Sequence, residues 1–206
     1  MSLQLLLIIA FSGAFITYLL GKLSHRLRDF FAVLVSCALV VLIALFYGKP
    51  VGNTFYLSFL DLSLFLRLNT LSWLFAITIA VVEALSIIFS LSYIRGKERT
   101  DFYYLMMLLV DASMLGIVLS GDLASFYIFW EIMSWSTFLL ISYKRGPALA
   151  AGMKYIIMSI VGSATMLVGV LSLYASYGTL TISELAVHIS SSSHGYILFL
   201  LILFFL

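Results

Sequence analysis

Charged residues are scarce in this sequence. Only 10% of its 206 residues are Asp, Glu, Lys or Arg, whereas an ordinary soluble domain carries about 25%. Hydrophobic residues make up 64% of the chain, and the mean hydropathy is +1.18. This composition excludes an ordinary soluble domain and predicts a polytopic membrane protein.

Cysteines and long polar segments are also nearly missing. The single cysteine, Cys37, lies in an apolar run, so it permits no intrachain disulfide and no cysteine-based metal site. The first apolar run starts at Leu3 without a basic segment before it and leads into further apolar runs, so we do not expect it to be a cleaved signal peptide. No loop exceeds roughly twenty residues. We therefore expect no extramembrane catalytic domain, no cofactor, no redox chemistry within this chain and no nucleic-acid binding.

Apolar runs long enough to cross a bilayer, which takes about 20 helical residues, occur six times. They cover roughly 3–21, 30–48, 70–93, 102–120, 122–142 and 149–176. A seventh run, 196–206, is too short to span by itself. We predict an all-α transmembrane bundle, residues 1–206, with six full spans and the start of a seventh. Its parts are two helices (1–48), an outer loop (49–69), a core (70–176), an outer loop (177–195) and the incomplete seventh helix (196–206).

Basic residues gather on alternate connections. Nine of the eleven Lys and Arg fall on one side, and only Lys49 and Arg67 fall on the other. By the positive-inside rule, the basic side is cytoplasmic and the N-terminus lies outside. The nine residues are Lys22, Arg26, Arg28, Arg95, Lys97, Arg99, Lys144, Arg145 and Lys154.

Two outer connections have a pattern of their own. Residues 55–69 partly alternate between apolar and polar, which predicts a short β-hairpin or an extended segment against the outer face. The second connection, 177–195, carries Glu184, His188 and His194 beside a serine run. For the two histidines, a solvated loop is favoured over a metal site.

Four ionisable residues lie inside the predicted spans. Glu83, Asp111 and Glu131 are each near the middle of a helix, and Lys154 follows the start of the sixth. A carboxylate at mid-bilayer depth costs roughly 2.5–3.5 kcal/mol on insertion scales, so its default interpretation is a proton or ion site. The alternatives are a neutral, hydrogen-bonded carboxyl and a contact with a partner subunit. Lys154 either extends to the headgroups or lowers the proton affinity of a nearby carboxylate.

Hydroxyl and small side chains recur at helical spacing around these acids. Asp111 has no clear polar neighbours on its own helix, so a helix–helix hydrogen bond explains it equally well. Small residues at 112, 116 and 120, and at 159 and 163, predict close helix contacts. The hydroxyl groups are those of Tyr127, Ser134 and Ser142 near Glu131, and of Ser86 and Ser90 near Glu83.

Four blocks of the sequence, in order, resemble one family. They are residues 68–75 (LNTLSWLF), 114–122 (MLGIVLSGD), 129–134 (FWEIMS) and 154–163 (KYIIMSIVGS). These blocks are similar to the antiporter-like subunits, the proton-pumping membrane subunits shared by respiratory complex I, membrane-bound hydrogenases and Mrp-type sodium/proton antiporters. The match covers about residues 60–185, while the first two helices agree only in hydropathy.

The resemblance implies roles for particular residues. Glu131 matches the FWE glutamate of the family's fifth helix, its central proton-handling carboxylate. Lys154 matches the lysine that opens the sixth helix, and Asp111 falls where many members carry an acid. Glu83 has no reliable counterpart, so its role rests on burial. Where the family has the sequence LDGLS, residues 68–72 here are LNTLS, so one carboxylate of the family pattern is missing. Members usually have about fourteen helices, with a lysine on a broken seventh helix that no residue here matches.

We therefore expect a subunit that translocates protons, or sodium and protons, within a multi-subunit membrane complex. Glu131 would take up a proton, and a positive charge that approaches or recedes would change its proton affinity; Lys154 is the only basic candidate in the chain. Expected partners are other membrane subunits, a chain supplying the C-terminal half, the lipid bilayer, H⁺ and possibly Na⁺. The expected location is a prokaryotic cell membrane. The alternatives are a structural subunit without transport of its own and a stand-alone carrier or receptor.

Overall fold

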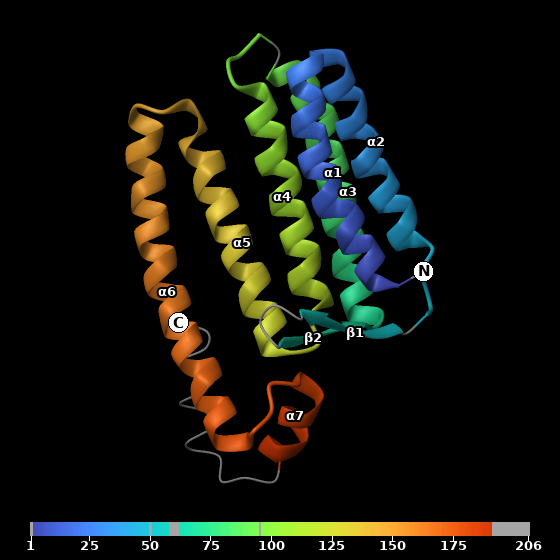
Figure 1. Ribbon diagram of the computed structural model, residues 1–206, viewed down its shortest axis with the longest axis vertical. Helices are drawn as coiled ribbons and strands as arrows, with labels where there is room; N and C mark the ends of the chain where they lie inside the picture. The colour runs from blue at the N-terminus through green and yellow to red at the C-terminus, as the bar shows by residue number, and fades with distance from the viewer. Residues whose placement is uncertain (1, 50, 58–61, 95, 191–206) are drawn as a thin grey trace.

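Within the residues that the structure describes, six helices are long and apolar enough to cross a membrane, as the sequence predicts. The computed structural model describes residues 2–49, 51–57, 62–94 and 96–190 (Figure 1). The expected seventh helix, 196–206, and His194 lie outside the described residues. The six helices are α1 (Leu3–Leu23), α2 (His25–Ala44), α3 (Thr70–Tyr93), α4 (Thr100–Leu119), α5 (Leu123–Ile141) and α6 (Pro147–Tyr177).

The sequence marks several helix ends with capping residues. The side chains of Ser2, Asn69 and Asp122 each accept a hydrogen bond from a backbone N–H in the first turn of the helix that follows. This satisfies donors that the helix itself leaves unpaired. Pro147 occupies the first turn of α6, where no N–H is needed. Gly178 ends the same helix with φ of 70°, a conformation that glycine adopts without strain.

Helices α1 to α4 form the packed part of the bundle. Figure 1 shows α5 beside α4 and α6 at the edge, where it packs along α5. The core is filled by leucine, isoleucine and alanine from α1 to α4, and the Tyr104 side chain is completely buried among them. Gly116 of α4 lies against the Phe129 ring of α5. The predicted close contact around residue 116 is therefore confirmed.

A β-hairpin crosses one end of the bundle. Strands β1 (Val51–Leu57) and β2 (Leu62–Leu68) pair antiparallel, with Val51 opposite Leu68. Leu64, Leu66 and Leu68 are all buried, because alternate side chains of a strand point to the same face. The expectation of a hairpin or extended segment here is confirmed as a hairpin, and its first strand begins at Val51, earlier than expected.

The expected polar loop 177–195 instead contains a nine-residue helix, α7 (Ile182–Ser190). Leu185 is buried against Leu123, Val170 and Leu173. Glu184 stands in the first turn of the helix, where a negative charge is favourable. The interpretation as a loop was wrong because only one narrow face of this segment is apolar, and its serines and histidine obscure that face in the sequence. Figure 1 places α7 at the hairpin side of the molecule.

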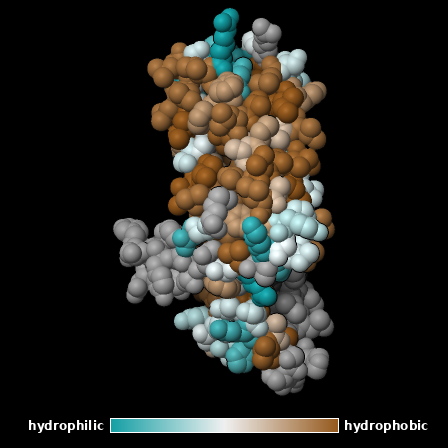
Figure 2. Space-filling model, turned by 90° about the vertical axis from the view of Figure 1, so that its right-hand side faces the viewer, coloured by the Kyte–Doolittle hydropathy of each residue, from teal (hydrophilic) through white to brown (hydrophobic). Residues whose placement is uncertain are grey.

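The polar residues lie toward the ends of the bundle. The connections α1–α2, α3–α4 and α5–α6 meet at one end, called here the basic end, and the hairpin lies at the other (Figure 1). Figure 2 shows apolar side chains over the helices and hydrophilic ones at the top and around the lower part. Phe30, Phe89 and Met158, on three different helices, are largely exposed. Such a surface suits lipid or neighbouring subunits, and the predicted sharing of one side by the basic connections is confirmed.

Candidate functional site

The three membrane-embedded acids stand on consecutive helices at similar depth. At 1.5 Å per residue, Asp111 lies about 16 Å from the start of α4 at the basic end. Glu131 lies about 12 Å from the start of α5 at the hairpin end. Glu83 is about 20 Å from the hairpin end of α3. All three therefore lie in the middle part of the bundle, as the sequence predicts.

Each acid has a buried oxygen without a hydrogen-bond partner among the described residues. Asp111 is 2% exposed, and neither of its carboxyl oxygens is paired. Glu83 and Glu131 each have one such oxygen, Oε1. Burying a polar group without a hydrogen-bond partner costs free energy. Such a group does not improve the packing of the helix bundle. Each of the three carboxyls therefore has at least one oxygen whose hydrogen-bonding capacity is unused in the described part of the chain.

Glu83 and Asp111 lie close enough on adjacent helices to interact electrostatically. Both belong to inward-facing rows of their helices: Glu83 lies between Ala80 and Ile87 on α3, and Asp111 follows Leu108 on α4. The sequence predicts mid-depth positions for both but contains no sign that they lie within electrostatic range of each other. The structure therefore brings two of the four predicted site residues together.

The hydroxyl group of Tyr127 lies beside Glu131. The side chain of Tyr127, one turn earlier on α5, lies beside Glu131 and also beside Ser163 of α6. Tyr127 was expected from helical spacing, whereas Ser163 appeared in the sequence only as a helix-contact residue. Ser134 is buried, and the Ser142 hydroxyl is buried without a hydrogen-bond partner in the described part of the chain. Glu131 thus faces the α5–α6 interface.

Lys154 lies on the face of α6 that points away from the rest of the bundle. Gly152 and Ile156, two residues on either side of it, are buried, and Gly152 packs against Ser142 and Phe138. Residues two apart on a helix point in nearly opposite directions, and Lys154 is exposed. None of the ion pairs within the described ranges involves it. The structure does not bring Lys154 to Glu131.

The sequence did not reveal that Asp122 connects several elements of the fold. Its carboxylate accepts hydrogen bonds from the Ser125 N–H at 2.7 Å, the Ser125 hydroxyl at 2.6 Å and the backbone N–H of Phe65 in β2. Asp122 also forms an isolated β-bridge with Thr181, just before α7. The Ser-Gly-Asp turn 120–122 therefore joins the hairpin, α5 and the segment that leads into α7. Only its position as an N-cap could have been anticipated.

Arg28 is the second residue with an unexpected role. It entered the sequence analysis as a cytoplasmic charge, yet it is only 4% exposed. Its guanidinium donates to Asp101 at 2.8 Å and to Asp29 at 2.7 Å, and also to the Thr100 hydroxyl. It lies 4.9 Å from the centre of the Tyr104 ring. This network joins α2 to the start of α4.

The chemistry available is that of carboxyl and hydroxyl groups. Over the described residues, no group of three or more His, Cys, Asp or Glu side chains could hold a metal ion. Buried acids beside hydroxyls suit the uptake and release of protons, and carboxylate oxygens also suit sodium.

Comparison with protein families supports the resemblance. Residues 120–206 match the family model described as NADH:quinone oxidoreductase/Mrp antiporter, transmembrane. The putative antiporter subunit mnhA2 of Staphylococcus aureus (strain MSSA476) is 35% identical over 153 residues, 71% of this chain and 19% of that protein. Na(+)/H(+) antiporter subunit A1 of Staphylococcus haemolyticus (strain JCSC1435) is 32% identical over 132 residues, 63% of this chain and 16% of that protein. The matched part is thus less than a fifth of these relatives' length.

Solved structures share the fold. The structure of the membrane-bound sulfane sulfur reductase, an archaeal respiratory membrane complex, contains a chain with a TM-score of 0.85 and 26% identity; the match covers 98% of this chain and 43% of that one. A chain of the Mrp complex from Dietzia sp. DQ12-45-1b gives 0.89 at 24% identity, covering 98% and 22%. One of respiratory complex I from Thermus thermophilus gives 0.75 at 19%, covering 97% and 42%. The predicted family resemblance and helical fold are confirmed.

Proposed function

We propose that this chain, which is similar to antiporter-like membrane subunits of Mrp-type and complex I-type assemblies, translocates protons, or exchanges sodium for protons. The observation that carries the proposal is Glu131, which has a buried unpaired oxygen near the middle of α5 and the hydroxyl of Tyr127 beside it. An ionisable residue at such depth marks an ion pathway more often than a packing contact.

The mechanism is electrostatic. Glu131 takes up a proton, and a positive charge that approaches it lowers its proton affinity so that the proton leaves. At an effective dielectric constant of about 20, a unit charge moved to about 8 Å changes the ionisation free energy by about 2 kcal/mol. This corresponds to about thirtyfold in proton affinity. A movement of a few ångströms is therefore sufficient.

The positive charge does not come from Lys154 as this chain is folded, because Lys154 faces away from α5. Lys154 can act on a carboxylate of a neighbouring subunit or on a segment that packs against the outer side of α6. The same face of α6 carries exposed Met158 and Val161, which need an apolar cover. A chain that supplies further helices would provide both the cover and the charge for Glu131.

The expected setting is a multi-subunit complex in a prokaryotic cell membrane. A structural role without transport is the second proposal, favoured by the extensive apolar surface of α6. Identifying the polypeptides that co-purify with this chain distinguishes the two proposals. Co-purification of a redox or antiporter arm, together with a chain that supplies further membrane helices, supports transport. Recovery of this chain without membrane partners contradicts both proposals.

Transport by the native assembly in liposomes tests the role of Glu131. The variant Glu131→Gln keeps the side-chain shape and removes the ionisable proton; we expect it to lower proton translocation by about 100-fold or more, the scale of a lost proton-transfer group. Glu98→Gln, an exposed acid at the basic end, is the matched control and should keep the wild-type rate. Unchanged translocation in Glu131→Gln would support the structural role instead.

A further inference from the structure

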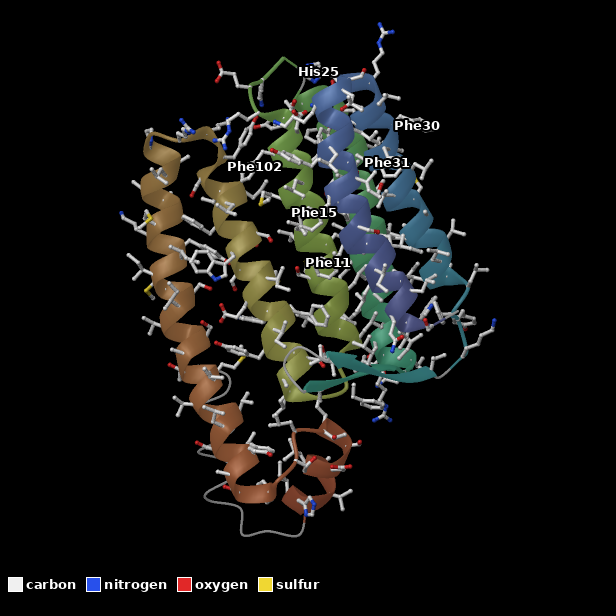
Figure 3. The ribbon with its side chains drawn as sticks, in the orientation of Figure 1. Phe11, Phe15, His25, Phe30, Phe31 and Phe102 are labelled. Carbon is white, nitrogen blue, oxygen red and sulfur yellow. The ribbon has the colours of Figure 1, made fainter. Side chains whose placement is uncertain are left out.

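A column of polar side chains descends from the basic end toward Glu83 and Asp111. It begins at a cavity of about 680 Å³ lined mainly by the start of α2 and by the connection between α3 and α4, with Leu91 and Ile94 among its apolar lining residues. Figure 3 shows His25, another lining residue, at the same end of the molecule as Phe102 of α4. The other polar lining residues include Arg28, Asp29 and Thr100. Water at the basic end therefore reaches the buried Arg28 network.

Tyr104 and Ser90 lie directly inward of that network. The Arg28 guanidinium is against the Tyr104 ring, and the Tyr104 and Ser90 oxygens are 3.1 Å apart. Both side chains are 1% exposed or less. The Ser90 oxygen is also 2.7 Å from the Ile87 carbonyl. A hydroxyl has one proton to donate, so Ser90 either donates to that carbonyl and accepts from Tyr104, or donates to Tyr104.

The alignment of α3 and α4 also determines where Glu83 and Asp111 lie. Helices α3 and α4 are antiparallel neighbours, and the Ser90–Tyr104 contact fixes their alignment. Seven residues make nearly two turns and return to almost the same face. A step of seven from Ser90 leads to Glu83, and a step of seven from Tyr104 leads to Asp111. Both steps run about 10 Å deeper into the bundle, where the two acids interact.

Apolar side chains separate the two levels. Ile87 and Leu108 are at most 1% exposed and lie on the same inner faces, between the hydroxyl pair and the acids. The acids are thus shielded from the cavity by one apolar layer. A proton crosses such a layer only when water enters it, so the layer limits exchange between the acids and the basic end.

Among the residues of α1 to α5 that the structure describes, few other ionisable groups reach this level. Tyr103 interacts electrostatically with Glu83. On α5, Glu131 is grouped with Tyr127 and Ser163 at the α5–α6 interface. On α1 and α2 the charged residues are near the basic end, and Cys37 is exposed. The ionisable residues of these helices are Tyr18, Lys22, His25, Arg26, Arg28, Asp29 and Cys37 on α1 and α2, Asp101, Tyr103, Tyr104 and Asp111 on α4, and Tyr127 and Glu131 on α5.

We propose that Glu83 and Asp111 form a second proton site, distinct from Glu131, in which two electrostatically coupled carboxyl groups hold one proton between them and exchange it with the basic end past Tyr104 and Ser90. Two carboxylates that interact at low dielectric repel each other, so one of the two carries the proton while the other is ionised. On exchange, the proton leaves one carboxyl oxygen and passes to water or a hydroxyl on the basic side. This inference depends on the proposed transport function.

The test measures proton translocation by the native assembly in liposomes with Glu83→Gln, Asp111→Asn and the double variant. We expect each single variant to be slower by about tenfold or more. Residues that act as one unit lose their effect together, so the double variant should be no slower than the slower single variant. Losses that multiply in the double variant overturn the sharing of one proton.

Tyr104→Phe tests the path, because it removes one hydroxyl and keeps the ring. We expect a several-fold slower rate that depends less on the pH at the basic side, with the thermal midpoint of the assembly unchanged. Thr78→Ala is the control, since Thr78 is exposed on α3 and its hydroxyl donates to the Leu74 carbonyl of its own helix. A wild-type rate and pH dependence in Tyr104→Phe would exclude this path.

Two further results separate this inference from the proposed function. Wild-type translocation in all three acid variants, in an assembly where Glu131→Gln abolishes it, overturns the inference and leaves the proposed function in place. Wild-type translocation in Glu131→Gln overturns the proposed function. Failure of both single variants to assemble, with Thr78→Ala intact, would show that the acids only hold the bundle together and would also overturn the inference.

Discussion

The carboxylate of Asp122 accepts a hydrogen bond from the backbone N–H of Phe65, a residue of β2 that lies 57 positions earlier in the chain. The same carboxylate caps α5 through the Ser125 N–H and hydroxyl. One side chain thus fixes the hairpin against the start of the helix that carries Glu131. The hairpin is a structural part of the site and not an independent loop.

Replacing Asp122 by Asn should destabilise the protein. The amide has one acceptor oxygen instead of two, so the Phe65 N–H or a Ser125 donor loses its partner, at a cost of about 1–3 kcal/mol. The measurement is the thermal midpoint of the purified chain in detergent. Asn69→Asp, at the exposed N-cap of α3, is the matched control and should leave the midpoint nearly unchanged. Equal midpoints for both variants would contradict the connecting role of Asp122.

A methyl group at Gly116 should disrupt the contact between α4 and α5. A Cβ there would come within 2.4 Å of the Phe129 ring, which also stacks on Phe11 of α1. Gly116→Ala should cost about 1–3 kcal/mol, typical of overpacking. Gly162→Ala on α6 has open space around the new Cβ and should be neutral, or stabilise by up to about 1 kcal/mol through helix propensity. Thermal unfolding of the two variants checks this difference; an equal response would exclude the close contact.

Removing the charge of Arg28 should weaken the basic end. Arg28→Met leaves Asp101 without the donor at 2.8 Å and Thr100 without its own. The expected loss is about 1.5–3 kcal/mol, the range of a hydrogen bond to a charged group. Arg26→Met removes an exposed cation two residues away and should change stability by less than about 0.5 kcal/mol. Chemical unfolding measures the free energy of unfolding of both variants. Similar losses in the two would show that the buried network of Arg28 does not stabilise the protein.

The fold could largely be predicted from the sequence. Long apolar runs fix the helices, alternating leucines reveal the hairpin, and charges on alternate connections give the arrangement of the ends. Helix α7 escaped because a short amphipathic helix with one buried leucine resembles a polar loop. Its contacts come from Leu123 and Val170, which are distant in sequence.

The site could be predicted only in part. The three acids were recognisable because a carboxylate within an apolar run has an evident cost. The direction of Lys154 could not be predicted, because it depends on which face of α6 packs against α5. Nothing in the sequence singled out Tyr104, and Arg28 was interpreted only as a charge that orients the chain. Only the alignment of α3, α4 and α2 shows that they belong to one polar column. Such alignments between helices leave no periodic signal in the sequence.

The central claim is that the carboxyl group of Glu131 carries the translocated proton. The most direct measurement compares proton translocation by the native assembly in liposomes for wild type, Glu131→Asp and Glu131→Gln, with equal amounts of assembled complex. The account predicts reduced translocation in Glu131→Asp, which keeps a shorter carboxyl group, and loss of translocation in Glu131→Gln, which keeps the length without the proton. A wild-type rate in Glu131→Gln would contradict it.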